Sequence, residues 1–335
     1  MKIQIATINA DSVLYKDSVK YLIESQGLNY EDDLEYYCTA HDGSGELIGC
    51  VGLAGTVIKC FAIRDDYQGE GISRSMMTEI ILLAYQLGRK SLSIFTSPDN
   101  VAIFESMRFQ AITSKYRRSV LLINRPDEII TLQHQLHSYK VTGNKIGSIV
   151  MNANPFTKGH AYLIEKAASE CDWVHIFVVR ENNQAFSFKD RFSMVKNGTL
   201  PIPNLTLHAG NDFMISKRTF PSYFLKESGN VHQVHAEIDC ELFANYIAPS
   251  LGITHRYIGS EPNCKVTENY NSIMKTMLQP HIEVVEFNRL LAEGCTISAS
   301  TVRNQLSNAA SAVASLLPVS TINYLVEHCG YALHI

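Results

Sequence analysis

The alternation of apolar and polar residues divides the chain into two stretches of different texture. Up to about residue 125, short alternating runs follow one another directly, and the Asp42–Gly45 turn joins two of them as a hairpin. The run Ile72–Leu87 has apolar residues at three- and four-residue spacing, which predicts a helix, and a shorter helix is expected at Asp99–Met107. The predicted strands are Lys2–Ile8, Glu35–His41, Leu47–Leu53, Val57–Ile63, Ser91–Thr96, Phe109–Ile112 and Ser119–Ile123.

From Lys145 onward, strand-like runs alternate with helical ones, which is typical of a parallel sheet with right-handed crossovers. The predicted strands are Ile146–Met151, Trp173–Val179, Leu205–His208, His255–Ile258 and Ile282–Glu286. We therefore expect an α/β protein with an α+β domain over residues 1–125, a connector over 126–144, and a Rossmann-like parallel-sheet domain over 145–335.

Composition narrows the class of protein. A chain of 335 residues favours two domains, and its net charge of -4 gives no basic half for a broad nucleic-acid surface. The eight cysteines are scattered and form no CxxC pair, so reduced thiols are expected and a zinc site is not. Neither a signal-like apolar segment nor a bilayer-length run is present, which favours a cytoplasmic protein without a membrane partner.

The nine residues Asn152–His160 read NANPFTKGH and lie between a predicted strand and the helical run Ala161–Ala168. A glycine followed by a histidine at such a turn places backbone N–H groups and an imidazole at the positive end of a helix, which suits a nucleotide phosphate. Thr157 can add a hydroxyl, Asn154 belongs to the same turn, and Gly159 lets the backbone approach a ligand closely. Alternatively, His160 only caps or packs the helix.

The later segment Ile297–Arg303 carries a second group of polar side chains. Ser298 is a candidate helix N-cap, while Ser300 and Thr301 can face an anion. Arg303 adds a forked cation for the β- and γ-phosphates and for departing pyrophosphate. A serine-rich run before a helix can also be no more than a cap. The functional hypothesis requires that His160 and Arg303 converge on one bound triphosphate.

Together the two segments resemble the signature of the nucleotidylyltransferase superfamily, a (His/Thr)-x-Gly-His turn and a late Ser/Thr-rich segment ending in a basic residue. The resemblance implies ATP as substrate, with Mg²⁺ carried by its phosphates and no metal site built from protein side chains. It also implies that Ile258–Pro262 lodges adenosine, through Gly259 and the carboxylate of Glu261. A simple turn with a surface glutamate is the alternative.

Two further sets of residues are candidates for the second substrate. Lys189 and Arg191 begin an amphipathic run and can hold a carboxylate or phosphate, although Asp190 and Arg191 can equally form a helix-end salt bridge. Tyr223 and Lys226 can contact this second substrate, or belong to the core.

The amino-terminal half has a glycine loop of its own, formed by Gln68, Gly69, Gly71 and Ser73, which follows a strand and opens the helix at Ile72. Backbone amides in such a loop suit a pyrophosphate. The loop resembles the acyl-CoA loop of GNAT acetyltransferases, except that Ser73 replaces the last small residue. The resemblance implies a site for a CoA-like arm, either with catalysis of acyl transfer or with binding alone.

A GNAT-like unit joined to a Thr-x-Gly-His unit resembles the citrate lyase ligase family over essentially the whole chain. That resemblance implies the conversion of ATP and acetate to acetyl-AMP and pyrophosphate. The acetyl group then passes to the thiol of the phosphoribosyl-dephospho-CoA arm on the acyl carrier subunit of citrate lyase. The alternatives are a tRNA cytidine acetate ligase-like enzyme, a protein N-acetyltransferase with a nucleotide-sensing domain, and a non-catalytic lyase subunit. The even charge balance disfavours a nucleic-acid partner.

Overall fold

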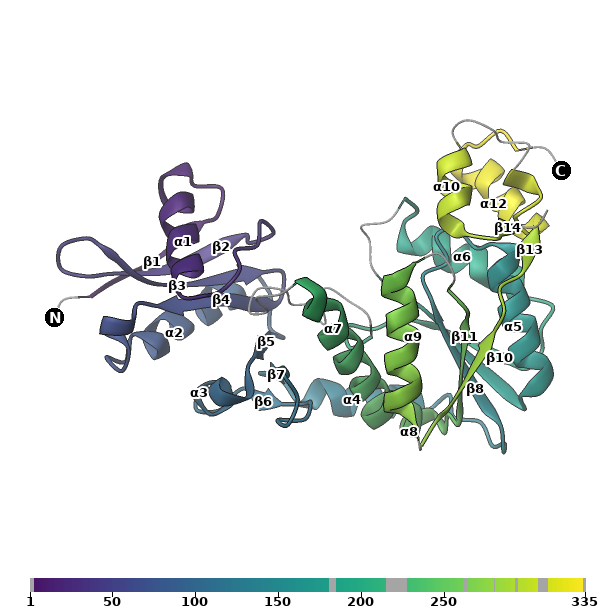
Figure 1. The fold of residues 1–335 in the computed structure, drawn as a ribbon, viewed down its shortest axis with the longest axis horizontal. Coiled ribbons are helices and arrows are strands. Elements are labelled where there is room, and N and C mark those ends of the chain that lie inside the picture. The colour runs from purple at the N-terminus through teal and green to yellow at the C-terminus, as the bar shows by residue number, and fades with distance from the viewer. Residues whose placement is uncertain are drawn as a thin grey trace. The chain divides into compact units, whose positions relative to one another are not determined.

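The computed structural model describes residues 3–180, 185–214, 228–261, 264–279, 281–292, 295–306 and 313–333. The chain forms two compact units (Figure 1). The first contains the residues up to Ile130 together with helix α7 as far as Ile238, and the second contains the remainder. The expected fold class is confirmed, because an α+β unit precedes a unit built on a parallel sheet.

The first unit is built on a seven-stranded sheet in the order β1-β2-β3-β4-β5-β7-β6. Only β4 and β5 pair in parallel, and the other neighbours are antiparallel. The strands are β1 (Gln4–Asn9), β2 (Tyr36–His41), β3 (Leu47–Ala54), β4 (Val57–Ile63), β5 (Ser93–Thr96), β6 (Gln110–Ala111) and β7 (Val120–Ile123). All were expected from the alternation of apolar residues, within a few residues at each end.

The helices of the first unit are α1 (Val13–Ser25), α2 (Ile72–Gln86) and α3 (Val101–Glu105), and helix α4 (Asp127–His137) follows the last strand. Helix α1 was missed because it buries Val19 and Ile23 but leaves Leu14 87% exposed and Tyr21 exposed as well, which blurs its helical period. Helix α4 lies within the stretch that the sequence had suggested as a connector.

The second unit is built on a five-stranded parallel sheet in the order β10-β9-β8-β11-β12. The strands are β8 (Ile146–Met151), β9 (Trp173–Val178), β10 (Leu205–Ala209), β11 (His255–Gly259) and β12 (Glu283–Phe287). The small hairpin of β13 (Leu291–Ala292) and β14 (Cys295–Thr296) follows β12. Strand β8 is central, and the chain continues from it first to one side and then to the other.

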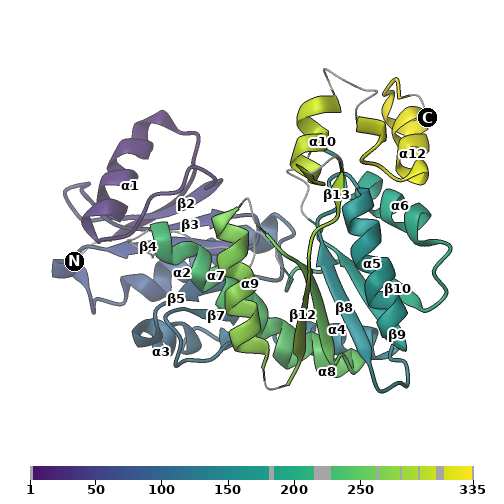
Figure 2. The same ribbon diagram turned by 45° about the vertical axis from the view of Figure 1, so that its right-hand side comes forward.

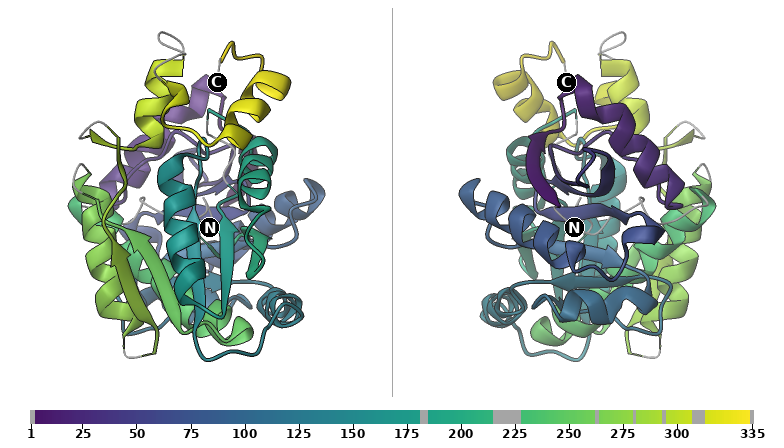
Figure 3. Two further views of the ribbon diagram at one scale, coloured as in Figure 1. Left: turned by 90° about the vertical axis from the view of Figure 1, so that its right-hand side faces the viewer. Right: turned by 90° about the vertical axis from the view of Figure 1, so that its left-hand side faces the viewer.

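Helices cover both faces of this sheet (Figure 2). One face packs on a cluster that includes Ile164, Val195 and Val302, from helices α5 (Lys158–Glu170), α6 (Phe188–Thr199) and α10 (Ala299–Leu306). The other face packs on Cys240, Leu251 and Met274, from α7 (Ser228–Leu242), α8 (Ala248–Leu251) and α9 (Lys265–Leu278). Helices α10 and α12 (Val319–Cys329) lie together at one end of the sheet (Figure 3).

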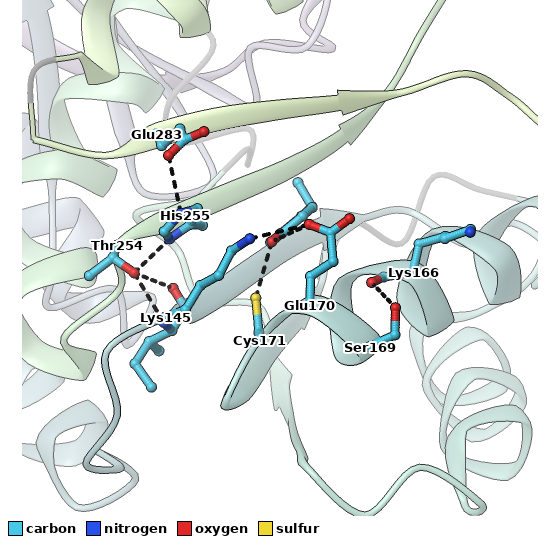
Figure 4. Close-up of polar contacts among 10 residues, drawn as sticks. Lys145, Lys166, Ser169, Glu170, Cys171, Thr254, His255 and Glu283 are labelled. Carbon is cyan, nitrogen blue, oxygen red and sulfur yellow. Dashed lines mark hydrogen bonds and ion pairs between the residues drawn. The ribbon is translucent and has the colours of Figure 1, made fainter.

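A polar network joins the strands at the amino ends of β8, β11 and β12 (Figure 4). Nζ of Lys145 lies 3.2 Å from Oε2 of Glu170, which also accepts a hydrogen bond of 3.2 Å from the hydroxyl of Tyr257. His255 bridges two strands, because its Nε2 lies 3.2 Å from Oε2 of Glu283. These contacts stabilise the amino edge of the sheet, which is opposite to the edge where the connections after β8, β11 and β12 begin.

Other sequence expectations concern what the chain lacks. Among the described residues, no helix has the length and apolar character needed to cross a membrane. No two cysteines in the described part of the chain form a disulfide.

A pair of histidines is buried between β9 and β10. Nδ1 of His175 lies 2.9 Å from Nε2 of His208, whose ring stacks on Phe177 at 4.7 Å and meets the edge of Tyr139 at 5.1 Å. Burial lowers the pKa of His175 to about 4, and burial with the neighbouring histidine lowers the pKa of His208 to about 3. Both imidazoles are therefore neutral at pH 7.

We predict that the free energy of unfolding falls as the pH drops from about 6.5 toward 4. In this window the unfolded chain binds protons that the folded pair excludes, so each pH unit costs up to about 1.4 kcal/mol per histidine. Urea midpoints at pH 7.5 and 5 measure the effect. In His175→Asn/His208→Gln, amide groups replace the two bonded ring nitrogens, and the pH dependence should be clearly weaker. An unchanged slope in the double variant would contradict the assignment.

Candidate active site

The carboxyl edge of the parallel sheet has a topological switch point between β8 and β11. From β8 the chain leads to β9 and β10 on one side, whereas β11 and β12 lie on the other. In open α/β sheets, ligands bind in the crevice outside the carboxyl ends of the strands at such a point. Three connections start there, after Met151, Gly259 and Phe287.

The connection after β8 presents His160 in one defined tautomer. Thr157 precedes α5, and its backbone N–H donates to Nδ1 of His160 at 3.0 Å while its Oγ1 lies 2.9 Å from the same nitrogen. Because Nδ1 accepts, the ring proton is on Nε2, which is thereby a hydrogen-bond donor. The imidazole also stacks on the buried ring of Phe156, with centroids 5.9 Å apart.

The charge state of His160 follows from its surroundings. Burial, with the positive charge of Arg289 as a second cause, lowers the pKa of His160 to about 4. The ring is therefore neutral at pH 7, at the amino end of a helix where the backbone dipole favours an anion. The arrangement offers a neutral N–H donor to negative charge.

Two residues of this turn are placed differently from the expectation. Thr157 is 1% exposed and its hydroxyl faces the histidine, so it orients the imidazole instead of facing a phosphate. Asn154 is buried, and its Oδ1 accepts a hydrogen bond of 3.1 Å from the backbone of Phe186. Its side chain thus connects two loops, while its backbone carbonyl accepts a hydrogen bond from Arg303.

The segment that opens α10 has the expected cap. Oγ of Ser298 accepts from the backbone N–H of Ser300 at 3.2 Å, and the two hydroxyl oxygens are 2.5 Å apart. Ser300 and Thr301 are exposed. The prediction of Ser298 as the N-cap is confirmed.

The two predicted motifs meet at this edge. Nη1 of Arg303 donates to the carbonyl of Asn154 at 2.5 Å, across 149 positions of sequence. Gly159 lies beside Ile297, whose carbonyl oxygen would be 3.5 Å from a Cβ added at the glycine. That distance is an ordinary contact, so the neighbouring protein atoms do not by themselves require glycine at position 159.

The third connection contributes an arginine that the sequence hypothesis missed. Arg289 follows β12, donates through Nε to the carbonyl of Ser260 at 2.7 Å, and forms an ion pair with Glu261. The carboxylate of Glu261, only 8% exposed, is therefore engaged by Arg289, and the carbonyl of Gly259 accepts from Asn271 at 3.1 Å. A basic residue two positions after the last parallel strand was the available sequence signal.

The residues that were candidates for binding the second substrate differ in their environment. Arg191 is fully buried, and its Nη1 donates at 2.8 Å to the carbonyls of Asn152 and Val179. It holds the ends of β8 and β9 together and does not offer its charge to a substrate, which corrects the expectation. Lys189 is exposed in the first turn of α6. Tyr223 and Lys226 lie outside the described residues.

The glycine loop of the first unit has the backbone that its sequence requires. Gly69 and Gly71 have φ of 89° and 76°, in the left-handed region that favours glycine, and Gly71 directly precedes α2. The side-chain amide of Gln68 donates to the carbonyl of Ile63 at 3.3 Å, while Ser73 lies in the first turn of the helix. The loop is exposed at the amino end of a 15-residue helix.

The second unit is an open parallel α/β sheet, with a histidine in the first turn of α5 and arginines on two connections of the switch point. Residues 146–325 match the family described as "Citrate lyase ligase C-terminal domain". The chain is 43% identical to a [Citrate [pro-3S]-lyase] ligase of Klebsiella pneumoniae, covering 93% of both chains. It is 41% identical to that of Escherichia coli K12, covering 92% of this chain and 91% of the relative. The chain belongs to the citrate lyase ligase family.

Two weaker similarities concern parts of the chain. A 64-residue stretch is 30% identical to a phosphopantetheine adenylyltransferase of Staphylococcus carnosus, covering 18% of this chain and 40% of the relative. A solved acyl-CoA N-acyltransferase of Pseudomonas aeruginosa is 16% identical, with a TM-score of 0.33, over 36% of this chain and 99% of that one.

We predict that Gly198→Ala, in the last turn of α6, disturbs the packing of Phe156 beneath the imidazole of His160. The new Cβ would lie 2.3 Å from Cε1 of Phe156, the ring on which His160 stacks. The overpacking should cost about 1–3 kcal/mol in the free energy of unfolding, more than the helix gains from alanine, about 1 kcal/mol. Urea unfolding of the purified variant checks this.

The matched control is a double-mutant cycle with Phe156→Leu. The smaller side chain leaves room for the added methyl group, so the double variant should be more stable than the sum of the two single effects predicts. Simple additivity would contradict a direct clash between residues 198 and 156.

Proposed function

We propose that this chain activates acetate with ATP, forming acetyl-AMP and pyrophosphate, and then acetylates the thiol of a carrier subunit of citrate lyase. The observation that carries the proposal is the neutral, Nε2-protonated His160 at the start of α5, on the turn whose Asn154 carbonyl binds Arg303. The names of the relatives support citrate lyase as the partner.

In the first step an acetate oxygen attacks the α-phosphorus and the bond from that phosphorus to the bridging oxygen of pyrophosphate breaks. Negative charge on the α-phosphoryl oxygens is then held by Nε2–H of His160 and by backbone N–H groups at the start of α5. No proton moves, because acetate and pyrophosphate are both anions. Holding the two reactants in line can supply several kcal/mol of the barrier reduction.

Two arginines and the serine-rich cap are suited to the leaving group. Arg303 and Arg289 come from different connections of the same edge, and Ser298, Ser300 and Thr301 open α10 beside them. No group of three or more His, Cys, Asp or Glu side chains among the described residues is arranged to hold a metal ion. A Mg²⁺ ion that binds chiefly to the triphosphate fits this donor set.

In the second step the carrier thiol attacks the carbonyl carbon of acetyl-AMP, AMP leaves with the bridging oxygen, and the thiol proton passes to solvent. The thioester that forms is the acetylated arm of the lyase. We assign the loop of Gln68, Gly69, Gly71 and Ser73 to the phosphate groups of a CoA-like arm, because its amides open a helix. Because the reaction would use ATP and the lyase carrier, we propose that it takes place in the cytoplasm.

The first experiment is exchange of labelled pyrophosphate into ATP. Exchange should require acetate, and His160→Ala should slow it by about 10²–10³, the usual effect of losing one oriented donor to developing charge. Because the pKa of His160 is about 4, the ionisation of this residue should not shape the rate between pH 6 and 8.

The control variant is His255→Asn, at the opposite edge of the same sheet (Figure 4). Its exchange rate should stay within about twofold of the parent, since it lies away from the reacting groups. Exchange that proceeds without acetate, or that is undiminished in His160→Ala, would overturn the activation step.

A separate measurement tests the carrier step. Full chain, ATP, Mg²⁺ and ¹⁴C-acetate are incubated with deacetylated citrate lyase, and label is followed on the carrier subunit together with lyase activity. Label should appear only when the thiol is free, and prior alkylation of that thiol should abolish it. Transfer of label to tRNA or to a protein amine instead would identify a different acceptor and reject this half of the proposal.

A further inference from the structure

The segment after β11, where the sequence predicts an adenosine contact, holds the side chain of Arg289. A Cβ added at Gly259 would lie 3.9 Å from Cγ of Arg289, so the aliphatic part of this side chain passes over the glycine. The Nε of Arg289 donates to the carbonyl of Ser260 at 2.7 Å, and its Nη2 forms the ion pair with Glu261. Three consecutive residues of this segment therefore contact one arginine.

Hydrogen bonds also hold the backbone on both sides of this contact. The N–H of Ser260 donates to the carbonyl of Phe287 at 2.8 Å, which continues the pairing of β11 and β12 beyond the last residue of β11. The Oγ of Ser260 accepts a hydrogen bond of 3.2 Å from the backbone N–H of Arg289. The backbone that carries the arginine and the loop that holds its side chain are therefore joined directly.

These contacts leave one edge of the guanidinium open. Nε and Nη2 of Arg289 are engaged by the segment after β11, whereas within the part of the chain that the structure describes no acceptor contacts Nη1. The side chain of Arg289 is 28% exposed and that of Glu261 is 8% exposed, so the carboxylate is the covered member of the pair. A guanidinium carries five donors, so the protein can hold one edge while the other binds phosphate oxygens.

The guanidinium of Arg289 lies near the imidazole of His160. Its positive charge is the second cause, after burial, of the lowered pKa of His160. The interaction between charges falls with distance and is weakened by solvent, so a cation that affects a buried imidazole lies close to it. Arg289 and the Nε2–H of His160 can therefore contact the same bound anion.

We propose that Glu261 is a positioning residue, which directs the open edge of Arg289 toward the triphosphate and does not bind the ribose of ATP. The carboxylate faces the guanidinium and is 8% exposed, so little of it is accessible to the ribose hydroxyl groups. An arginine held in one orientation loses less conformational freedom when a phosphate binds. The inference rests on the proposed function, because that function supplies ATP as the anion that Arg289 and His160 share.

The test is a double-mutant cycle on ATP binding, measured by titration calorimetry with the full chain and Mg²⁺ but no acetate. Arg289→Met should weaken binding by about 10- to 100-fold, the usual effect of losing a hydrogen bond to a charged group. In that background the charge of Glu261 is no longer balanced by the arginine and repels the phosphates. Adding Glu261→Gln should therefore recover part of the affinity. If Glu261 bound the ribose, the double variant would lose a second contact and bind ATP more weakly than Arg289→Met.

A second measurement needs only Glu261→Gln, so it decides the question if Arg289→Met fails to fold. The ratio of the affinities for ATP and for 2′-deoxy-ATP or 3′-deoxy-ATP should be the same in this variant and in the parent, while the affinity for all three falls several-fold. The control is Glu283→Gln, which removes the ion pair with His255 at the opposite edge of the sheet and should leave ATP affinity unchanged.

Two results would overturn the inference alone, provided that the parent exchanges pyrophosphate in an acetate-dependent way. One is a changed ratio in Glu261→Gln, and the other is a double variant that binds ATP more weakly than Arg289→Met. A parent chain that binds no ATP would instead reject the inference together with the proposed function.

Discussion

The hydrogen bonds between Thr157 and Nδ1 of His160 determine what the edge of the parallel sheet can do. They fix the ring proton on Nε2, and burial keeps the imidazole neutral, so the site offers a donor that carries no charge of its own. Such a donor favours charge that develops during a reaction over charge already present in the bound anion. The arginines on two other connections provide the permanent positive charge.

Two arginines hold the turn that carries His160 through hydrogen bonds to backbone carbonyls. Arg191 binds the carbonyls at the ends of β8 and β9, and Arg303 binds the carbonyl of Asn154. One arginine is therefore structural and the other lies at the edge, although both donate to backbone oxygens. A guanidinium serves both purposes because its planar fork satisfies several carbonyls at once.

The sequence alone predicted the fold class, nearly every strand, and the two motifs that meet at the edge. Strict alternation and strand–helix order carry that information locally. It could not predict Arg289 beside His160, the inward turn of Thr157, or the burial of Arg191, because each depends on which distant backbone groups share a space. Helix α1 was not predicted for a local reason, because Leu14 and Tyr21 are apolar residues on its exposed side and blur its helical period.

The three lowered histidine pKa values imply that acid affects the stability of the second unit before it charges these imidazoles. His160 would remain uncharged until the medium is near pH 4, so mild acidification leaves the donor chemically intact. The buried pair His175 and His208 lowers the free energy of unfolding at higher pH than that, because the unfolded chain already binds protons that the folded pair excludes. Between about pH 6.5 and 4, acid therefore lowers the free energy of unfolding while the imidazole of His160 is still largely neutral.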